Sequence, residues 1–215
     1  MKYRLIIFDI DGTITTHISS WRYIHEKLGL WDNRAFHYQE KFLAGKISYR
    51  RFCELDAAHW KGISDTRIRR IFRSVRYSKN AVKVVEKLKN HGFKIAAIST
   101  GLQYIPERLK IEMGFDCCLS NRLLSRNGRL TGKVDIAIPH GAKGRIVKKL
   151  IRHFNVRKSE VISVGDTAGD IPLAKNSGFS FAFNSTSKEL SRTVKYNCKT
   201  KDFNEIYKKI CEITW

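Results

Sequence analysis

The sequence predicts an α/β fold with a Rossmann-like, mostly parallel sheet flanked by helices and a small all-helical cap inserted after the first strand. Apolar runs of strand length alternate with stretches of helical periodicity along most of the 215 residues. From residue 17 to residue 77 the periodicity is helical throughout, and this stretch is too long for a simple loop. We therefore expect a core domain made of residues 1–16 and 78–215 and a helical cap domain made of residues 17–77.

The first strand is expected at residues 3–8, an apolar run that is typical of a strand buried on both faces. Asp9 and Asp11 follow it directly, and Gly12 allows the chain to turn sharply there. Two carboxylates so close together are costly unless a cation or a shared proton offsets their charge. The stretch therefore predicts a divalent metal site, an acid/base pair or both, although Asp-x-Asp-Gly is also typical of a plain turn.

The cap is expected to cover these carboxylates as a lid. Its last helix has an apolar stripe formed by Ile68, Ile71, Phe72 and Val75. Another stripe of the same helix carries Arg69, Arg73 and Arg76. Such charges usually belong to a solvated face, and the alternative is that some of them contact an anionic substrate.

Beyond the cap, helices and strands alternate, as a mostly parallel sheet requires. Helices are expected at residues 78–91, 105–113, 143–151, around 173–174 and at 203–213, and strands at residues 93–98, 115–119, 160–164, 179–183 and 194–196. Asn127-Gly128 lies between two short segments at residues 123–126 and 129–132, and this dipeptide predicts a hairpin with a type I′ turn.

Polar residues follow the ends of three of these strands and should meet at one edge of the sheet, because parallel strands share the edge where they end. They are Asp9 and Asp11, then Ser99, then Asp166 and Asp170, with Lys143 at the start of the helix that leads into the third strand. This combination predicts a site for phosphoryl transfer.

Each residue type in this set has a role in that chemistry. An aspartate can attack phosphorus and form an aspartyl-phosphate, and its charge must then be offset by a cation. Mg²⁺ prefers oxygen ligands, which Asp9 and Asp166 could supply, and Lys143 adds positive charge of its own. Ser99 can donate to a phosphoryl oxygen, and Asp11 can protonate the leaving oxygen and then deprotonate water.

These motifs resemble the haloacid dehalogenase superfamily, and within it the phosphoserine phosphatase-like branch. The resemblance covers nearly the whole chain, is weakest in the cap, and rests on residues 9–13 (Asp-Ile-Asp-Gly-Thr), Ser99, residues 121–132, residues 142–144 (Ala-Lys-Gly) and residues 165–170 (Gly-Asp-Thr-Ala-Gly-Asp). It implies that Asp9 is the nucleophile and Asp11 the general acid/base.

The same resemblance implies the ligand-binding residues. The phosphoryl group would be bound by Ser99, Thr100, Gly101 and Lys143. Mg²⁺ would be bound by Asp9, the backbone carbonyl of Asp11, Asp166 and Asp170. Because dehalogenases of the superfamily lack the second aspartate, Asp11 implies a phosphatase.

Three departures from the family pattern concern the substrate. Residues 15–22 contain no acid, where phosphoserine phosphatases carry a glutamate that recognises the amino group. Glu54 stands where the family has an arginine for the substrate carboxylate, with Arg50 and Arg51 nearby, and Gly169 replaces an asparagine. We therefore expect a Mg²⁺-dependent phosphomonoester hydrolase that acts on a small phosphorylated metabolite, with the metabolite unassigned.

The net charge of +21 favours anionic partners, unless it is a general surface adaptation. Together with the aromatic cap residues Trp21, Trp31, Tyr38 and Trp60, it leaves open a basic nucleic-acid-binding protein or a nucleic-acid end-phosphatase. A phosphotransferase or mutase of the same fold is a third alternative, because the acceptor of the phosphoryl group is not encoded in these motifs.

Cysteine and hydropathy patterns predict a cytoplasmic protein that does not enter a membrane. The five cysteines form no Cys-x-x-Cys pair, so we interpret them as small buried hydrophobic residues in a reducing compartment. No apolar run approaches the roughly 18 residues of a membrane span. The chain begins directly with a strand-forming run and not with a signal-peptide pattern. The oligomeric state is not indicated.

Overall fold

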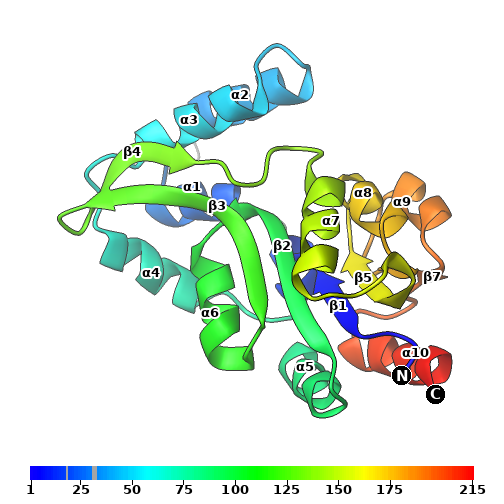
Figure 1. Cartoon of the computed structure of the whole chain (residues 1–215). Coiled ribbons are helices and arrows are strands. Elements are labelled where there is room, and N and C mark those ends of the chain that lie inside the picture. Colours follow the sequence, from blue (N-terminus) through cyan, green and yellow to red (C-terminus); the bar gives the residue numbers. More distant parts are fainter. Residues whose placement is uncertain (18, 31–32) are drawn as a thin grey trace.

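The computed structural model describes residues 1–17, 19–30 and 33–215, and within them the chain forms one seven-stranded sheet of order β4-β3-β2-β1-β5-β6-β7 (Figure 1). The strands are β1 (Leu5–Phe8), β2 (Lys94–Leu102), β3 (Cys117–Arg126), β4 (Arg129–Asp135), β5 (Val161–Gly165), β6 (Phe179–Ala182) and β7 (Tyr196–Asn197). Neighbouring strands pair in parallel, except that β3 and β4 form an antiparallel hairpin. The mostly parallel sheet expected from the sequence is thus confirmed.

The register of the central strands brings the polar residues together. Phe8, the last residue of β1, is paired with Ala97 of β2 on one side and with Val164 of β5 on the other. Asp9 comes one residue after Phe8, and Ser99 and Asp166 come two residues after those partners, so the three residues lie within one residue of the same level of the sheet. The side chains expected to share an edge consequently do so.

Helices cover both faces of the sheet (Figure 1). Ile6 and Phe8 belong to an apolar cluster that includes residues of α5 (Ala81–Asn90), α6 (Tyr104–Met113) and α10 (Phe203–Thr214). Leu5 and Ile7 belong to a second cluster with residues of α7 (Lys143–His153) and α8 (Ile171–Lys175). Because successive side chains of a strand point to opposite faces, the continuous apolar run of β1 fits a strand buried on both sides.

Four helices separate β1 from α5, and we call them the cap: α1 (Ser20–Leu28), α2 (Asn33–Leu43), α3 (Tyr49–His59) and α4 (Asp65–Arg73). An antiparallel bridge between Thr15 and Tyr77 joins the two ends of this insertion, and Ser78 N donates to the carbonyl of Ile14 over 2.7 Å. The cap also bonds to the hairpin, since Leu130 N donates to Ile63 O over 2.8 Å.

Several details differ from the sequence-based expectations. The segment 115–119 and the first arm of the hairpin form the single strand β3, and a helix that was not expected, α9 (Lys188–Thr193), precedes β7. The turn does have Asn127 and Gly128 at positive φ, 50° and 72°, as a type I′ turn requires. The interpretation of the cysteines as buried holds only for Cys53, because the other four are partly exposed, although all five are free thiols.

No helix among the described residues is both long enough and apolar enough to cross a membrane. Trp31, one of the aromatic residues behind the nucleic-acid hypothesis, lies outside the described residues.

Candidate active site

The loop after β1 is packed closely against the loop after β5. Residues 10–14 form a wide turn in which Gly12 has a φ of +84°, and a Cβ atom there would lie 2.2 Å from Asp166 Oδ2. Next to it, the Thr13 hydroxyl donates to Asp166 Oδ1 over 2.9 Å. Glycine at position 12 therefore permits both the left-handed backbone and the close approach of the two loops.

Three carboxylates and one ammonium group form a buried cluster at this edge. One oxygen each of Asp9, Asp166 and Asp170 can be chosen so that all three lie within 4.8 Å of one another. Lys143 Nζ donates to Oδ1 of Asp9 and to Oδ1 of Asp170, each over 2.5 Å. Three acidic groups thus face a single lysine, and the excess negative charge can be offset by a bound cation or by protons.

The pKa values of these groups reflect that imbalance. Burial, followed by the charge of Asp170, raises the pKa of Asp9 well above its usual range, while Lys143 opposes the effect. Burial and Asp170 likewise raise the pKa of Asp166 to about 7. Burial acts to lower the pKa of Lys143, but Asp170 and Asp9 outweigh it, so the net shift is upward and the ammonium stays charged.

Asp170 also holds the loop after β5 in shape. Its Oδ2 accepts hydrogen bonds from the backbone N–H groups of Asp166 and Thr167, both at 3.0 Å. A Cβ atom on Gly165 would lie 2.5 Å from Cβ of Asp170, so the strand end must be a glycine. Asp170 therefore combines contact with Lys143 and positioning of Asp166.

The carboxylate of Asp11 faces the cap, and its bonds are separate from the three-carboxylate cluster. Its Oδ2 accepts from the N–H and the hydroxyl of Ser20 over 3.2 and 2.9 Å, and its Oδ1 lies 3.1 Å from Nε2 of His17. Burial acts to raise the pKa of Asp11, but the hydrogen bonds and charge of His17 and Ser20 lower it by more, so the net shift is downward. The pKa values of the two neighbouring aspartates are thus shifted in opposite directions, upward for Asp9 and downward for Asp11.

Residues 99–101 lie in the last part of β2, which extends to Leu102 and not only to residue 98 as expected from the sequence, and they are held between the sheet and the cap. Ser99 is buried, and its hydroxyl oxygen accepts from Gly101 N over 2.8 Å. The Thr100 carbonyl accepts three donors: Trp21 Nε1 at 3.1 Å, Tyr49 OH at 2.8 Å and Asn121 Nδ2 at 2.8 Å.

Gly101 is enclosed by polar atoms of β2, of the loop after β1 and of the cap. A Cβ atom there would lie 2.3 Å from Ser20 Oγ, 2.4 Å from Asp11 Oδ2 and 2.9 Å from Ser99 Oγ. We expect Gly101→Ala to displace Asp11, to lower the catalytic efficiency with a phosphate ester by about tenfold or more, and to lower the unfolding free energy by about 1–3 kcal/mol.

Steady-state kinetics and thermal unfolding check the Gly101→Ala prediction. Gly92→Ala is the control, since position 92 has a positive φ but open space around it, so only stability should fall. An unchanged kcat/KM in Gly101→Ala would contradict the prediction.

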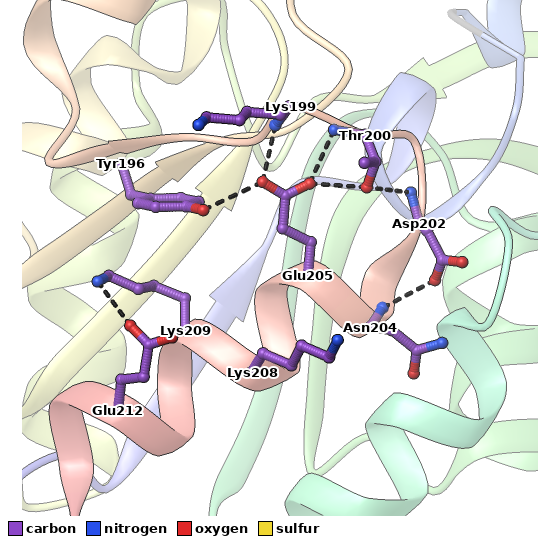
Figure 2. A pocket seen from close by; sticks show the side chains of 9 residues that line it. All are labelled: Tyr196, Lys199, Thr200, Asp202, Asn204, Glu205, Lys208, Lys209 and Glu212. Atoms are coloured by element: carbon purple, nitrogen blue, oxygen red, sulfur yellow. Dashed lines mark hydrogen bonds and ion pairs between the residues drawn. The ribbon is translucent and has the colours of Figure 1, made fainter.

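Two hollows of the molecule differ in whether they lie near the polar edge of the sheet. One of about 500 Å³ is lined by residues of β7, of α10 and of the segment between them (Figure 2), and Asp9, Asp166 and Asp170 are not among its lining residues. There Glu205 accepts from Tyr196 OH, from the N–H groups of Lys199 and Thr200, and from the Thr200 hydroxyl, at 2.6–3.1 Å. These bonds anchor the segment before α10, which is a structural role.

A second hollow, of about 310 Å³, lies between the cap and the core. Its lining comes from α1, α2 and α3, together with Thr100 and His140. Thr100 follows Ser99 directly, and His140 stands three residues before Lys143. This hollow therefore lies next to the residues expected to bind phosphate.

The structure groups the expected site residues in two sets. Asp9, Lys143, Asp166 and Asp170 contact one another, whereas Asp11, Ser99 and Gly101 meet beside Ser20 of the cap. Sequence reasoning assigned no role to Thr13, His17, Ser20 or Asn121. The partners of Thr13 and Asn121 are far away in the chain, whereas His17 and Ser20 contact Asp11 six and nine residues before them. Thr13 and Asn121 gave a signal only as members of the motifs that carry the family resemblance.

Arg69 and Arg73 of α4 do not line the second hollow, and neither does Arg76, which lies beyond the end of this helix and not within it as expected. Arg69 is paired with Asp65 and Glu107, both at 2.6 Å, while Arg73 and Arg76 are exposed. Arg73 and Arg76 therefore fit the interpretation as solvated surface charges.

Comparisons with known proteins agree with this geometry. The family model described as haloacid dehalogenase-like hydrolase matches residues 6–175. The chain is 31% identical to a phosphoserine phosphatase of Archaeoglobus fulgidus over 89% of its own length and 55% of that relative, so it spans about half of it. It is 25% identical to a phosphoserine phosphatase of Methanocaldococcus jannaschii over 97% of this chain and 98% of the relative.

Solved structures show the same fold. One described as a phospho-aspartyl intermediate analogue of phosphoserine phosphatase superposes with a TM-score of 0.83 at 24% identity, covering 97% of this chain and 99% of that one. A substrate-bound phosphoserine phosphatase complex has the same TM-score and identity.

Proposed function

Because the chain belongs to the haloacid dehalogenase-like hydrolase family, we propose that it is a phosphatase that hydrolyses a small phosphate monoester through an aspartyl-phosphate intermediate. The observation that carries the proposal is the buried cluster in which Lys143 holds Asp9 beside Asp166 and Asp170. A carboxylate fixed by an ammonium group in a buried site is well placed to act as a nucleophile, because the reacting atom is already oriented.

The reaction has two steps. In the first, a carboxylate oxygen of Asp9 attacks phosphorus, the bond from phosphorus to the ester oxygen breaks, and Asp11 gives that oxygen a proton. In the second, Asp11 takes a proton from water, the water oxygen attacks phosphorus, and phosphate leaves as the Asp9 carboxylate is restored. Asp11 thus ends as it began, because the proton that it gives to the ester oxygen is replaced by the one that it takes from water.

Ser99, Thr100, Gly101 and Lys143 bind the phosphoryl group in this proposal. The Ser99 hydroxyl oxygen accepts from Gly101 N, so its own hydrogen can point to a phosphoryl oxygen. Lys143 contributes a positive charge that its carboxylate neighbours maintain.

The residues also fit a divalent cation of the Mg²⁺ type. The oxygens of Asp9, Asp166 and Asp170 are hard ligands gathered in a buried place with excess negative charge, and the backbone carbonyl of Asp11 is the further ligand we propose. Bound Mg²⁺ would neutralise negative charge on the phosphoryl oxygens.

Cation binding should depend on pH in a defined direction. An acid whose pKa is raised on folding binds more protons in the folded state, so the metal-free protein should lose stability as pH rises from about 4 to about 7. Mg²⁺ competes with those protons, so the rise in melting temperature that it causes should be larger at about pH 8 than at about pH 5.5.

Thermal unfolding with Mg²⁺ or EDTA at both pH values measures this effect. Asp166→Asn should remove most of the Mg²⁺-induced rise, whereas Asp135→Asn, at an exposed position of β4, should keep it. An equal rise at both pH values would count against the proposed site.

Phosphate release from a panel of monoesters tests the function itself. The panel contains phosphoserine, sugar phosphates, nucleotides and a phosphorylated oligonucleotide, each with Mg²⁺ or EDTA. Mg²⁺-dependent release from a small ester is the expected result. Absence of release from every member would refute the proposal.

For Trp21 and Trp60, two of the four aromatic residues of the nucleic-acid hypothesis, the structure does not favour a role in stacking on bases. Trp60 is fully buried and Trp21 is nearly so, and their rings stack on each other at 5.7 Å. Rings enclosed in this way are not available to stack on bases.

A further inference from the structure

The hollow between cap and core is lined by residues of both. On the core side these are Thr100, which follows Ser99 directly, and His140, which stands three residues before Lys143 in the chain. An ester whose phosphoryl group lies beside Ser99 and Lys143 would therefore place its alcohol part in this hollow. This inference rests on the proposed function.

Aromatic rings form a large part of the wall of the hollow. Phe42 and Phe52 stack with centroids 5.3 Å apart, and the rings of Tyr49 and His140 lie 5.5 and 5.3 Å from Phe42. Phe42, Tyr49 and Phe52 are only partly buried, so they keep surface open to the hollow. At its rim, Leu43 is 73% exposed, which is an apolar surface that a ligand could cover.

The charged side chains of the lining are already engaged with neighbours in the cap. Arg22 donates to Glu26 over 2.6 Å. Asp56 is 2% exposed and lies 3.3 Å from Nε2 of His25.

The charged residues considered from the sequence for binding a charged substrate do not line this hollow. Arg51 and Glu54 do not line the hollow and pair with each other at 3.8 Å, and Arg50 is exposed. The hollow is therefore not built like a receptor for an amino acid with two opposite charges.

We propose that the substrate is a phosphate ester of an uncharged alcohol that carries an aromatic ring, and that Phe42, Tyr49 and Phe52 receive this ring. Burial of the ring removes apolar surface from water, and ring–ring contacts add to that gain. The rings thus select the alcohol, while the chemistry at Asp9 is the same for every ester.

Esters of primary alcohols test the proposal, because they differ in the group that enters the hollow more than in the leaving oxygen. We would compare phenethyl phosphate with ethyl phosphate, O-phosphoserine and phosphocholine, all with Mg²⁺. We expect phenethyl phosphate to be hydrolysed with a catalytic efficiency (kcat/KM) that exceeds the efficiencies with the other three esters by about tenfold or more.

Variants of α2 test whether the preference for the aromatic ester arises from the rings of the hollow. Phe42→Ala should bring the catalytic efficiencies with phenethyl phosphate and with ethyl phosphate to within about threefold of each other. Phe42→Leu keeps an apolar side chain in case the alanine variant folds poorly, and it should lose part of the preference. The control is Phe36→Ala, on the same helix but 50% exposed and outside the lining, which should keep the full preference.

The outcomes separate the two proposals. Hydrolysis of ethyl phosphate or phosphoserine as fast as that of phenethyl phosphate would overturn the ring pocket and leave the phosphatase intact. A clear preference for phosphocholine would also overturn it, because the ring faces would then recognise a cation. No hydrolysis of any ester would refute the proposed function, and the inference with it.

Discussion

Asp9→Asn is expected to abolish phosphate release, with kcat lowered by at least about a thousandfold. The amide cannot attack phosphorus as the carboxylate does, and no other group of the cluster lies in its place at the end of β1. The measurement is single-turnover and steady-state phosphate release with Mg²⁺. Exposed Asp135→Asn is the matched control and should keep full activity.

The same variant should not be less stable without metal. Asp9 shares a buried site with Asp166 and Asp170, and those charges raise its pKa. Removing one of three acidic groups relieves repulsion, so the melting temperature in EDTA should stay the same or rise. A folded variant that still releases phosphate at a rate near the original would disprove the role of Asp9.

Lys143→Met is expected to damage both activity and stability. The Lys143 ammonium is the only cation within hydrogen-bonding distance of Asp9 and Asp170 among the described residues. Its removal leaves these carboxylates buried without a cationic partner, at an expected cost of about 3–5 kcal/mol in unfolding free energy. The melting temperature should fall by about 6–20 °C in a chain of this size.

The loss of stability in Lys143→Met should depend on pH and on the presence of Mg²⁺. Because carboxylates without a cation take up protons at low pH, the difference from the original protein should be smaller at about pH 5 than at about pH 8. Mg²⁺ should restore part of the stability and little of the activity. Lys149→Met, at an exposed position of α7, is the control. Equal losses of stability and activity in the two variants would contradict the proposed role of Lys143.

Sequence reasoning reached the sheet and its polar edge because those features are local. The apolar run of β1, the glycine at position 12 and the spacing of Asp166 and Asp170 each fit a short stretch of chain, and parallel strands must share an edge. The hairpin turn was likewise encoded in two residues, Asn127 and Gly128.

The partners of Asp11 and the lining of the cap hollow could not be predicted in the same way. Ser20, at the start of α1, contacts Asp11 through the path of the turn between them, and Tyr49 contacts Asn121 and Thr100 across the interface of cap and core. Such contacts depend on how helices pack in three dimensions. The periodicity of the cap residues indicated helices and not which side chains face the hollow.

The two ends of the cap insertion lie side by side. The bridge between Thr15 and Tyr77, and the Ser78 hydroxyl that donates to Thr13 O over 2.6 Å, tie the outgoing and returning chain together just beyond the carboxylate loop. Evolution can therefore rebuild the part of the chain between these ties, and with it the range of accepted esters, while the loop that carries Asp9 and Asp11 keeps its anchor on the sheet.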